Sequence, residues 1–258
     1  MKGLTLAELD AWKAPYQKYI IDSGILVPGT KLILFGRYQT WKSMLAVHTA
    51  ACIATGRMWF GYRTSKTPSY VLQVENPQAQ FKERTMKYAS GNNLDLNTPG
   101  LWLCTEPYIK LDKGFGIAEL DKELSRTGAK VLIVDPIYKV VSGRVTDEYD
   151  MRQFMDRMDL MMAKYNFSLI LVHHDRKMQL IDGKYISSGA DDMFGTSIFI
   201  DWADTSIHTQ LTDTDGEVLL TFEKVRHSPD IAPGRQLLIK IDRSTLAFSK
   251  KIEATPDT

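Results

Sequence analysis

The sequence predicts an α/β fold with a mostly parallel, twisted sheet flanked by helices. Four apolar runs that are typical of buried strands alternate with segments of helical periodicity, which is the pattern of βαβ units. Three later strand-like runs follow one another closely, so we expect an antiparallel extension near the C-terminus. The chain of 258 residues is long enough for one large α/β domain or two small ones.

The first half of the chain predicts a helical N-terminal segment followed by βαβ units. Thr5 to Ile25 is typical of one or two amphipathic helices, because Thr5 and Glu8 have the spacing of a capping box. The elements that follow are a strand at 31–35, a helix at 44–54 capped by Gly56, a strand at 69–75, a helix to about Ser90 and a short strand at 101–104.

The second half continues this alternation and then changes. We expect a helix at 117–126, a buried strand at 130–135, a Met-rich helix at 147–165 and a buried strand at 168–173. A polar loop from His174 to about Asp192 and a short helix near Ser197 come next. Strands are then predicted at 205–212, 217–225 and 236–242, with a hairpin turn at 213–216.

Composition narrows the class of protein. Hydrophobic residues make up 44% and charged residues 24%, and the net charge is +1, so any binding site for a polyanion must be local. Cys52 and Cys104 give neither a disulfide framework nor a zinc site, which fits a reducing cytosol and predicts a cytoplasmic protein. No apolar run approaches the ~20 residues of a membrane span, so no membrane partner is expected.

The clearest functional signal is the segment Gly36-Arg37-Tyr38-Gln39-Thr40-Trp41-Lys42-Ser43. It lies between a predicted strand and a predicted helix, as a phosphate-binding P-loop requires. Such a loop surrounds a triphosphate with backbone N–H groups and the positive end of a helix. We expect Lys42 to reach the β- and γ-phosphates and Ser43 to ligate Mg²⁺.

Trp41 departs from the motif, because it occupies the position of the second glycine. Glycine there permits a backbone conformation that other residues reach only with strain of about 1–3 kcal/mol. Three interpretations stay open: a variant loop that still binds nucleotide, a relic that no longer does, and a chance match.

Polar residues at the ends of predicted strands supply the remaining candidates, because ligands of open α/β sheets bind at the carboxyl ends of strands. Asp135 follows an apolar strand and would hold Mg²⁺, although an Asp there could also cap the next turn. Glu75 would activate the attacking water, unless it is simply solvated. Of His173 and His174, one could contact the γ-phosphate while the other packs in the core.

Two basic groups are candidates for contacts beyond the chain's own nucleotide. The loop that carries Arg176, Lys177 and Lys184 suits a nucleic-acid backbone, although a plain surface loop is an equal alternative. Lys224 and Arg226 could reach a neighbouring subunit's γ-phosphate as a finger pair, the alternative being a solvated strand face.

Together these residues resemble the RecA-like ATPases of the RepA type, which are hexameric replicative helicases and their phage and plasmid relatives. The resemblance rests on 35–61, on 74–77 with Arg84, on 134–136, on 172–177 with 187–190, and on 224–226. The resemblance covers most of the chain, from about Gly29 to Asp242, and implies a RecA-like P-loop NTPase core. We expect this core at 29–250, an N-terminal helical segment at 1–28 and a flexible tail at 251–258.

The resemblance also implies partners and roles. ATP with Mg²⁺ would lie between the subunits of a homo-oligomeric, six-fold ring with single-stranded DNA in its centre, and loading could need a replication partner. Lys42 and Ser43 would bind phosphates and Mg²⁺, Asp135 would hold the metal, Glu75 would activate water and His174 would sense the γ-phosphate. Lys224 and Arg226 would act in trans.

Three functions therefore compete. The first is a Mg²⁺-dependent ATPase motor on single-stranded DNA in replication or recombination. The second is a RecA-like module that binds DNA or a partner and hydrolyses ATP weakly or not at all, an alternative motivated by Trp41. The third is a phosphotransferase acting on a small molecule, for which the chain offers no acceptor motif.

Overall fold

The computed structural model describes residues 3–13, 18–145, 147–175, 180–181, 184–185 and 198–254. Its main-sheet strands are β1 (Lys31–Gly36), β2 (Ser69–Gln73), β3 (Leu101–Thr105), β4 (Val131–Asp135), β5 (Ser168–His174), β8 (Thr205–Leu211), β9 (Glu217–Val225), β10 (Arg235–Ile241) and β11 (Phe248–Ala254). Its helices are α1 (Leu6–Ala11), α2 (Lys42–Thr55), α3 (Gln78–Gly91), α4 (Gly114–Thr127), α5 (Ile137–Val140), α6 (Glu148–Tyr165) and α7 (Ile198–Trp202). A separate antiparallel pair joins β6 (Leu180–Ile181) to β7 (Lys184–Tyr185).

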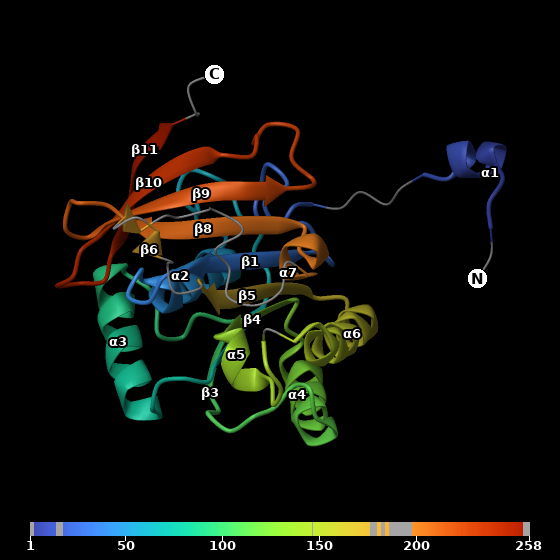
Figure 1. The fold of residues 1–258 in the computed structure, drawn as a ribbon, viewed down its shortest axis with the longest axis horizontal. Helices are drawn as coiled ribbons and strands as arrows, with labels where there is room; N and C mark the ends of the chain where they lie inside the picture. Colours follow the sequence, from blue (N-terminus) through green and yellow to red (C-terminus); the bar gives the residue numbers. More distant parts are fainter. Residues whose placement is uncertain are drawn as a thin grey trace.

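The strands form one mixed sheet of nine in the order β11-β10-β9-β8-β1-β5-β4-β2-β3 (Figure 1). The six strands from β8 to β3 run parallel to one another, whereas β9, β10 and β11 continue from β8 as an antiparallel extension. This arrangement confirms the predicted fold class. The hairpin turn between β8 and β9 is also confirmed, with Gly216 at φ 75°.

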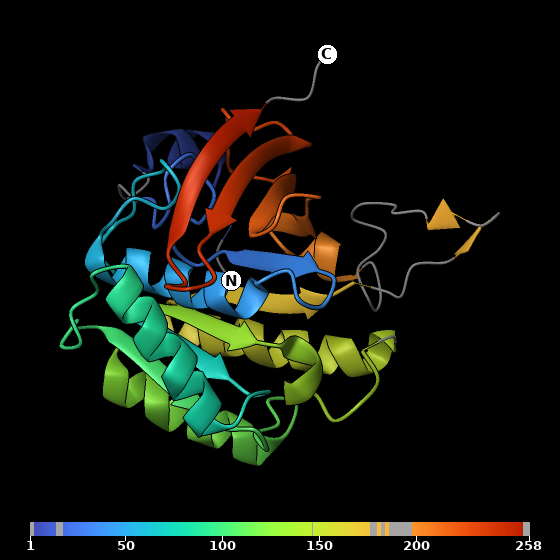
Figure 2. The same cartoon turned by 90° about the vertical axis from the view of Figure 1, so that its left-hand side faces the viewer.

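Side chains that alternate along the central strands build two halves of the core. Ile33 and Phe35 of β1 belong to the cluster that includes α4, α6 and α7, whereas Leu32 and Leu34 belong to the cluster that includes α2. Figure 2 shows the orange and red C-terminal strands above the parallel strands and the green helices below them. Because both faces are covered, the strands read as continuous apolar runs in the sequence.

The N-terminal helix is much shorter than predicted. The capping box of Thr5 and Glu8 is present, but α1 ends at Ala11, and residues 18–25 are not helical. Ser23 and Gly24 have φ values of 57° and 69° and form a turn, while Ile21 bridges to both Leu26 and Thr64. The apolar residues in this stretch are therefore buried by a turn and not by a helix face. Figure 1 shows α1 standing apart from the sheet.

The C-terminal end of the sheet carries a strand that was not predicted. β11 pairs antiparallel with β10 and extends to Ala254, so residues 251–254 are not part of a frayed tail. Phe248 at its start packs on His48 and Phe60, with ring centroids 4.9 and 6.2 Å apart. The strand thus brings the antiparallel part of the sheet into contact with α2.

The other predicted elements are present with shifts of a few residues. Gly56 caps α2 in the left-handed conformation at φ 74°, as expected. α4 begins at Gly114, three residues before its predicted start, and the short helix α5 was not predicted. Among the described residues, no helix has the length and apolar character needed to cross a membrane.

Candidate active site

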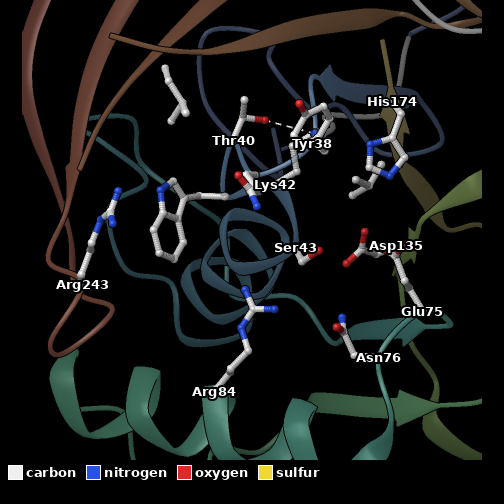
Figure 3. A pocket seen from close by; sticks show the side chains of 14 residues that line it. Tyr38, Thr40, Lys42, Ser43, Glu75, Asn76, Arg84, Asp135, His174 and Arg243 are labelled. Carbon is white, nitrogen blue, oxygen red and sulfur yellow. Dashed lines mark hydrogen bonds between the residues drawn. The ribbon is translucent and has the colours of Figure 1, made fainter. Parts of the chain in front are cut away.

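The sequence-predicted residues meet in a cavity at the carboxyl end of the parallel strands. β1 lies between β5 and β8, so that Gly36 pairs with His174 on one side and with Thr209 on the other. The cavity has a volume of about 530 Å³ (Figure 3). Its lining includes Tyr38, Gln39, Thr40, Trp41, Lys42, Ser43, Glu75, Asn76, Arg84, Asp135, Val172, His174, Leu211 and Arg243.

Two residues of the loop between β1 and α2 have a left-handed backbone conformation, and one of them is the tryptophan. Gln39 and Trp41 both have φ 64°, and Trp41 is the N-cap residue immediately before α2. Trp41 therefore adopts the left-handed conformation that a glycine would adopt without strain. Gly36 is required for a different reason, because a Cβ there would lie 2.4 Å from the carbonyl oxygen of Thr209.

Lys42 lies folded back inside this loop. Its ammonium donates to Thr40 Oγ1 at 3.1 Å (Figure 3). It also donates to the carbonyl oxygen of Gly36 at 2.7 Å and contacts the carbonyl oxygen of Arg37. Burial lowers the pKa of Lys42 to about 8, although Asp175 and Asp135 act in the opposite direction. The loop therefore holds a buried cation whose oxygen partners could be exchanged for phosphate oxygens.

Asp135 is a buried carboxylate beside the first turn of α2. Its exposed fraction is 2%, and burial raises its pKa to about 6 although Ser43 hydrogen-bonds to it. A carboxylate oxygen and a hydroxyl oxygen are hard ligands of the kind that Mg²⁺ takes. A desolvated carboxylate at this depth gains from a nearby cation, so the pair fits a magnesium ion that is completed by phosphate oxygens and water.

Glu75 lies across the cavity from the loop and is held by a residue that the sequence did not reveal. Glu75 Oε1 accepts a hydrogen bond of 2.7 Å from the hydroxyl of Tyr138, the second residue of α5. The Tyr138 ring is 5.4 Å from the ring of His174. Burial lowers the pKa of His174, which favours its neutral form. His173 is buried instead and packs edge-on against Phe199.

Two arginines from distant elements also face the cavity. Arg84 comes from α3, and Arg243 comes from the turn between β10 and β11. The guanidinium carbon of Arg243 lies 5.8 Å from the centroid of the Trp41 ring, within the range of a cation–π contact. Arg84 belongs to the residues that carry the family resemblance, whereas no sequence pattern marked Arg243.

A second buried polar pair, His208 and Asp175, lies beside the loop between β1 and α2. His208 Nε2 is 3.0 Å from Asp175 Oδ2, and the His208 ring stacks on Phe35 with centroids 4.7 Å apart. The backbone N–H of Asp175 donates to the carbonyl oxygen of Gly36 at 3.2 Å. Arg37, which does not line the first cavity, lines a neighbouring one with this pair.

Lys224 and Arg226 lie elsewhere, at the end of β9 that pairs with the amino end of β8. Ser206 near the start of β8 pairs with Lys224, whereas the P-loop end of β1 pairs with Thr209. Lys224 Nζ donates to the carbonyl oxygen of Ile200 at 2.7 Å, and Arg226 Nη1 is 3.2 Å from Asp204 Oδ1. Neither side chain lines the cavity of its own chain.

The predicted nucleic-acid contacts are not described. Arg176 and Lys177 lie outside the described residues, as do residues 187–190. The backbone of Lys184 belongs to β7, but its side chain is also outside the described part of the chain.

Comparisons with known proteins identify the family and the fold of this chain. The family model of the AAA domain matches residues 2–179. One solved structure, itself an isolated ATPase domain, superimposes with a TM-score of 0.65 at 10% identity, over 87% of this chain and 85% of that chain. A search of curated proteins found no significant sequence match.

Two further solved structures share the fold. The RadB recombinase has a TM-score of 0.56 at 15% identity, over 87% of this chain and 92% of that chain. A KaiC-like protein from the hyperthermophilic archaeon Pyrococcus horikoshii OT3 has a TM-score of 0.59 at 14% identity, over 90% of this chain and 94% of that chain.

Proposed function

Because this chain belongs to the AAA domain family and is a P-loop ATPase with the RecA-like fold, we propose that it hydrolyses ATP to move along single-stranded DNA. The proposal extends to a homo-oligomeric ring of six subunits that acts in replication or recombination. A bound Mg²⁺ would neutralise charge on the β- and γ-phosphates during phosphoryl transfer.

Different residues of the chain would bind the phosphates, hold the metal, activate the water and sense the γ-phosphate. Lys42 exchanges its loop carbonyls for phosphate oxygens, and the N–H groups of the loop and of the first turn of α2 surround the phosphates. Ser43 and Asp135 hold the metal. Glu75, oriented by Tyr138, accepts a proton from the attacking water, and His174 reports the γ-phosphate to the segment that follows it.

One observation carries the ATPase part of this proposal. A buried carboxylate and a solvent-exposed carboxylate, Asp135 and Glu75, line the same cavity as Lys42. This arrangement supports metal binding by the first and action as a base by the second, and hydrolysis requires both roles beside one phosphate site.

The DNA and ring parts rest on other support. RadB is a recombinase and shares the fold, and the ordered motifs resemble those of ring helicases. Lys224 and Arg226 lie beside the amino end of β8, at the opposite end of the strands from the chain's own cavity, which suits action on a neighbour's nucleotide.

Phosphate release, measured with and without single-stranded DNA on size-fractionated protein, tests the proposal. We expect turnover that requires Mg²⁺, is stimulated by DNA and belongs to the oligomeric fraction. Lys42→Ala should abolish turnover and weaken ATP binding, whereas Glu75→Gln should abolish turnover and keep ATP binding. Unchanged turnover in either variant would refute the assignment of these residues.

A second candidate function is a DNA- or partner-binding module that hydrolyses ATP weakly or not at all. The left-handed Trp41 favours it, because strain in the loop would weaken binding of the phosphates. DNA binding without DNA-stimulated phosphate release would select this function over the motor.

A further inference from the structure

Trp41 and Arg243 form a paired surface inside the cavity, although one belongs to the P-loop and the other to the last hairpin of the sheet. The guanidinium carbon of Arg243 lies 5.8 Å from the centroid of the indole. Asp215 pairs with the same guanidinium at 2.5 Å, and Lys87 donates to the Arg243 carbonyl oxygen at 2.9 Å. The arginine is therefore held in place on both its side chain and its backbone.

This pair lies at the end of the cavity away from the groups assigned to phosphate chemistry. Figure 3 shows Arg243 on one side of the pocket, Glu75 and His174 on the other, and Lys42 with Ser43 between them. The two ends of a nucleoside triphosphate differ in the same way, with the γ-phosphate at one end and the base at the other. With its γ-phosphate beside Glu75, the molecule would extend toward Arg243.

We propose that Trp41 and Arg243 form the base-binding subsite of the nucleotide pocket, with the base stacked on the indole and held there by the guanidinium. This inference rests on the proposed ATP binding and adds a specificity-determining contact to it. The indole supplies a large, rigid aromatic face, and Leu211, which is half exposed, adds an apolar wall to the cavity.

The residue that breaks the P-loop motif thus has a function that glycine could not provide. Stacking of a nucleobase on an aromatic side chain is worth about 1–3 kcal/mol, which corresponds to roughly fivefold to more than a hundredfold in affinity. This gain is comparable to the strain of about 1–3 kcal/mol that the left-handed tryptophan introduces. Because stacking depends on the area of the ring, purine nucleotides should bind more tightly than pyrimidine nucleotides.

A rival explanation is that Trp41 only fills space, since the indole also packs against two clusters of the core. The two explanations differ in their dependence on the base. A packing role affects the loop and therefore every ligand that carries a triphosphate. A base-binding role affects nucleotides and leaves inorganic tripolyphosphate unchanged.

Titration calorimetry of the full chain with Mg²⁺ and either ATP, CTP or inorganic tripolyphosphate separates them. We expect the wild-type protein to bind ATP roughly tenfold more tightly than tripolyphosphate, with CTP between the two. Trp41→Gly, which can keep the left-handed backbone, should remove most of this tenfold preference while tripolyphosphate affinity stays equal or rises. Trp41→Phe should retain most of the preference, and Arg243→Gln should reduce it roughly threefold.

Three outcomes would overturn the inference. Equal loss of ATP and tripolyphosphate affinity in Trp41→Gly assigns the indole to packing. Equal affinity of the wild type for ATP and tripolyphosphate removes the base contact but leaves the phosphate site intact. Absence of binding for every ligand overturns the ATPase proposal together with this inference.

Discussion

In the proposed nucleotide site, Lys42 and Asp135 would set the pH range in which the cavity binds Mg²⁺ and ATP. Burial lowers the pKa of Lys42 to about 8 and raises the pKa of Asp135 to about 6. Below the lower value the carboxylate takes up a proton and loses its attraction for a metal. Above the higher value the ammonium loses its proton and its attraction for phosphate. Both groups carry the charges that binding needs only between about pH 6 and 8.

We therefore predict a bell-shaped dependence of Mg²⁺-ATP affinity on pH, with its maximum between about pH 6 and 8. Calorimetry on either side of this range measures it. Asp135→Asn should remove the acid limb and Lys42→Ala the alkaline limb, each with lower affinity overall. A wild-type affinity that stays flat with pH would contradict the charge assignment.

In the proposed mechanism, Tyr138 would position Glu75. Its hydroxyl donates to Glu75 Oε1 at 2.7 Å, so Tyr138→Phe removes the hydrogen bond and leaves the ring beside His174. We predict that kcat for ATP hydrolysis falls roughly tenfold, because a mobile carboxylate aligns water less often. KM should stay unchanged, because Tyr138 is not among the residues that line the cavity.

Tyr149→Phe is the matched control for this variant. Tyr149 lies on α6 with 73% of its surface exposed, and its variant should keep both constants. An altered KM in Tyr138→Phe, or an unaltered kcat, would show that the Tyr138 hydroxyl does not position the base.

The sequence predicted the residues assigned to phosphate and metal binding better than the residues around them. Lys42, Ser43, Glu75, Asp135 and His174 line the cavity together. Glu75, Asp135 and His174 lie at or just after the end of a strand whose apolar run is easy to recognise, and Lys42 and Ser43 begin the helix that follows the loop after such a strand. Tyr138 and Arg243 carried no such signal. The position of Arg243 depends on the β10–β11 hairpin, and β11 itself was not predicted. The sequence also left open whether Trp41 could enter the left-handed conformation that the structure shows.

At the scale of elements, the close approach of β1 and β8 fixes the start of the P-loop. Thr209 of β8 donates to the carbonyl oxygen of Phe35 at 3.1 Å, and its Oγ1 is 2.8 Å from Thr40 Oγ1. A Cβ at Gly36 would come within 2.1 Å of the same hydroxyl oxygen and 2.4 Å of the Thr209 carbonyl oxygen. Part of this contact is backbone, so it cannot be relieved by a change of rotamer.

We predict that Gly36→Ala lowers the free energy of unfolding by about 1–3 kcal/mol, because β8 must move away from β1. Urea unfolding followed by circular dichroism measures this change. Gly114→Ala is the control, since a Cβ at the start of α4 meets nothing within 4 Å. The control should stay within about 0.5 kcal/mol of the wild type. Equal stability of the two variants would contradict the close-packing argument.

Elements defined by long apolar runs were predicted, and elements defined by tertiary contacts were not. The parallel strands are buried on both faces, so their sequences identify them without knowledge of their neighbours. β11 contains Lys250 and Lys251, and such charged residues are typical of exposed edge strands and of chain ends alike. Residues 18–25 have apolar residues at helical spacing, yet a Cβ at Gly24 would lie 2.2 Å from the carbonyl oxygen of His227. This contact with a distant loop requires a turn and could not be foreseen locally.

At the scale of the whole molecule, the phosphate loop and the proposed finger pair, Lys224 and Arg226, lie at opposite ends of the parallel strands. The phosphate loop lies at the carboxyl end of β1, whereas Lys224 pairs with Ser206 near the amino end of the neighbouring strand β8. Within one chain these groups cannot meet around a single γ-phosphate. In the proposed ring, a head-to-tail arrangement would bring Lys224 and Arg226 of one copy to the phosphate loop of the next. Such an interface closes into a ring where the rotation between copies closes, and otherwise makes an open filament.

Mixing two inactive variants tests this arrangement. Lys42→Ala removes the phosphate contact of its own chain, and Arg226→Ala removes the finger that would serve a neighbour. We predict that each variant alone is inactive, and that an equimolar mixture recovers up to roughly a quarter of wild-type turnover. About one interface in four then joins an intact Lys42 to an intact Arg226.

Recovery must follow exchange of subunits, so the mixture should stay inactive when the two oligomers are cross-linked before mixing. Full activity of Arg226→Ala alone, or no recovery after demonstrated exchange, would show that the finger pair does not act between chains, and Lys224 and Arg226 would then only anchor β9 to α7 and Asp204.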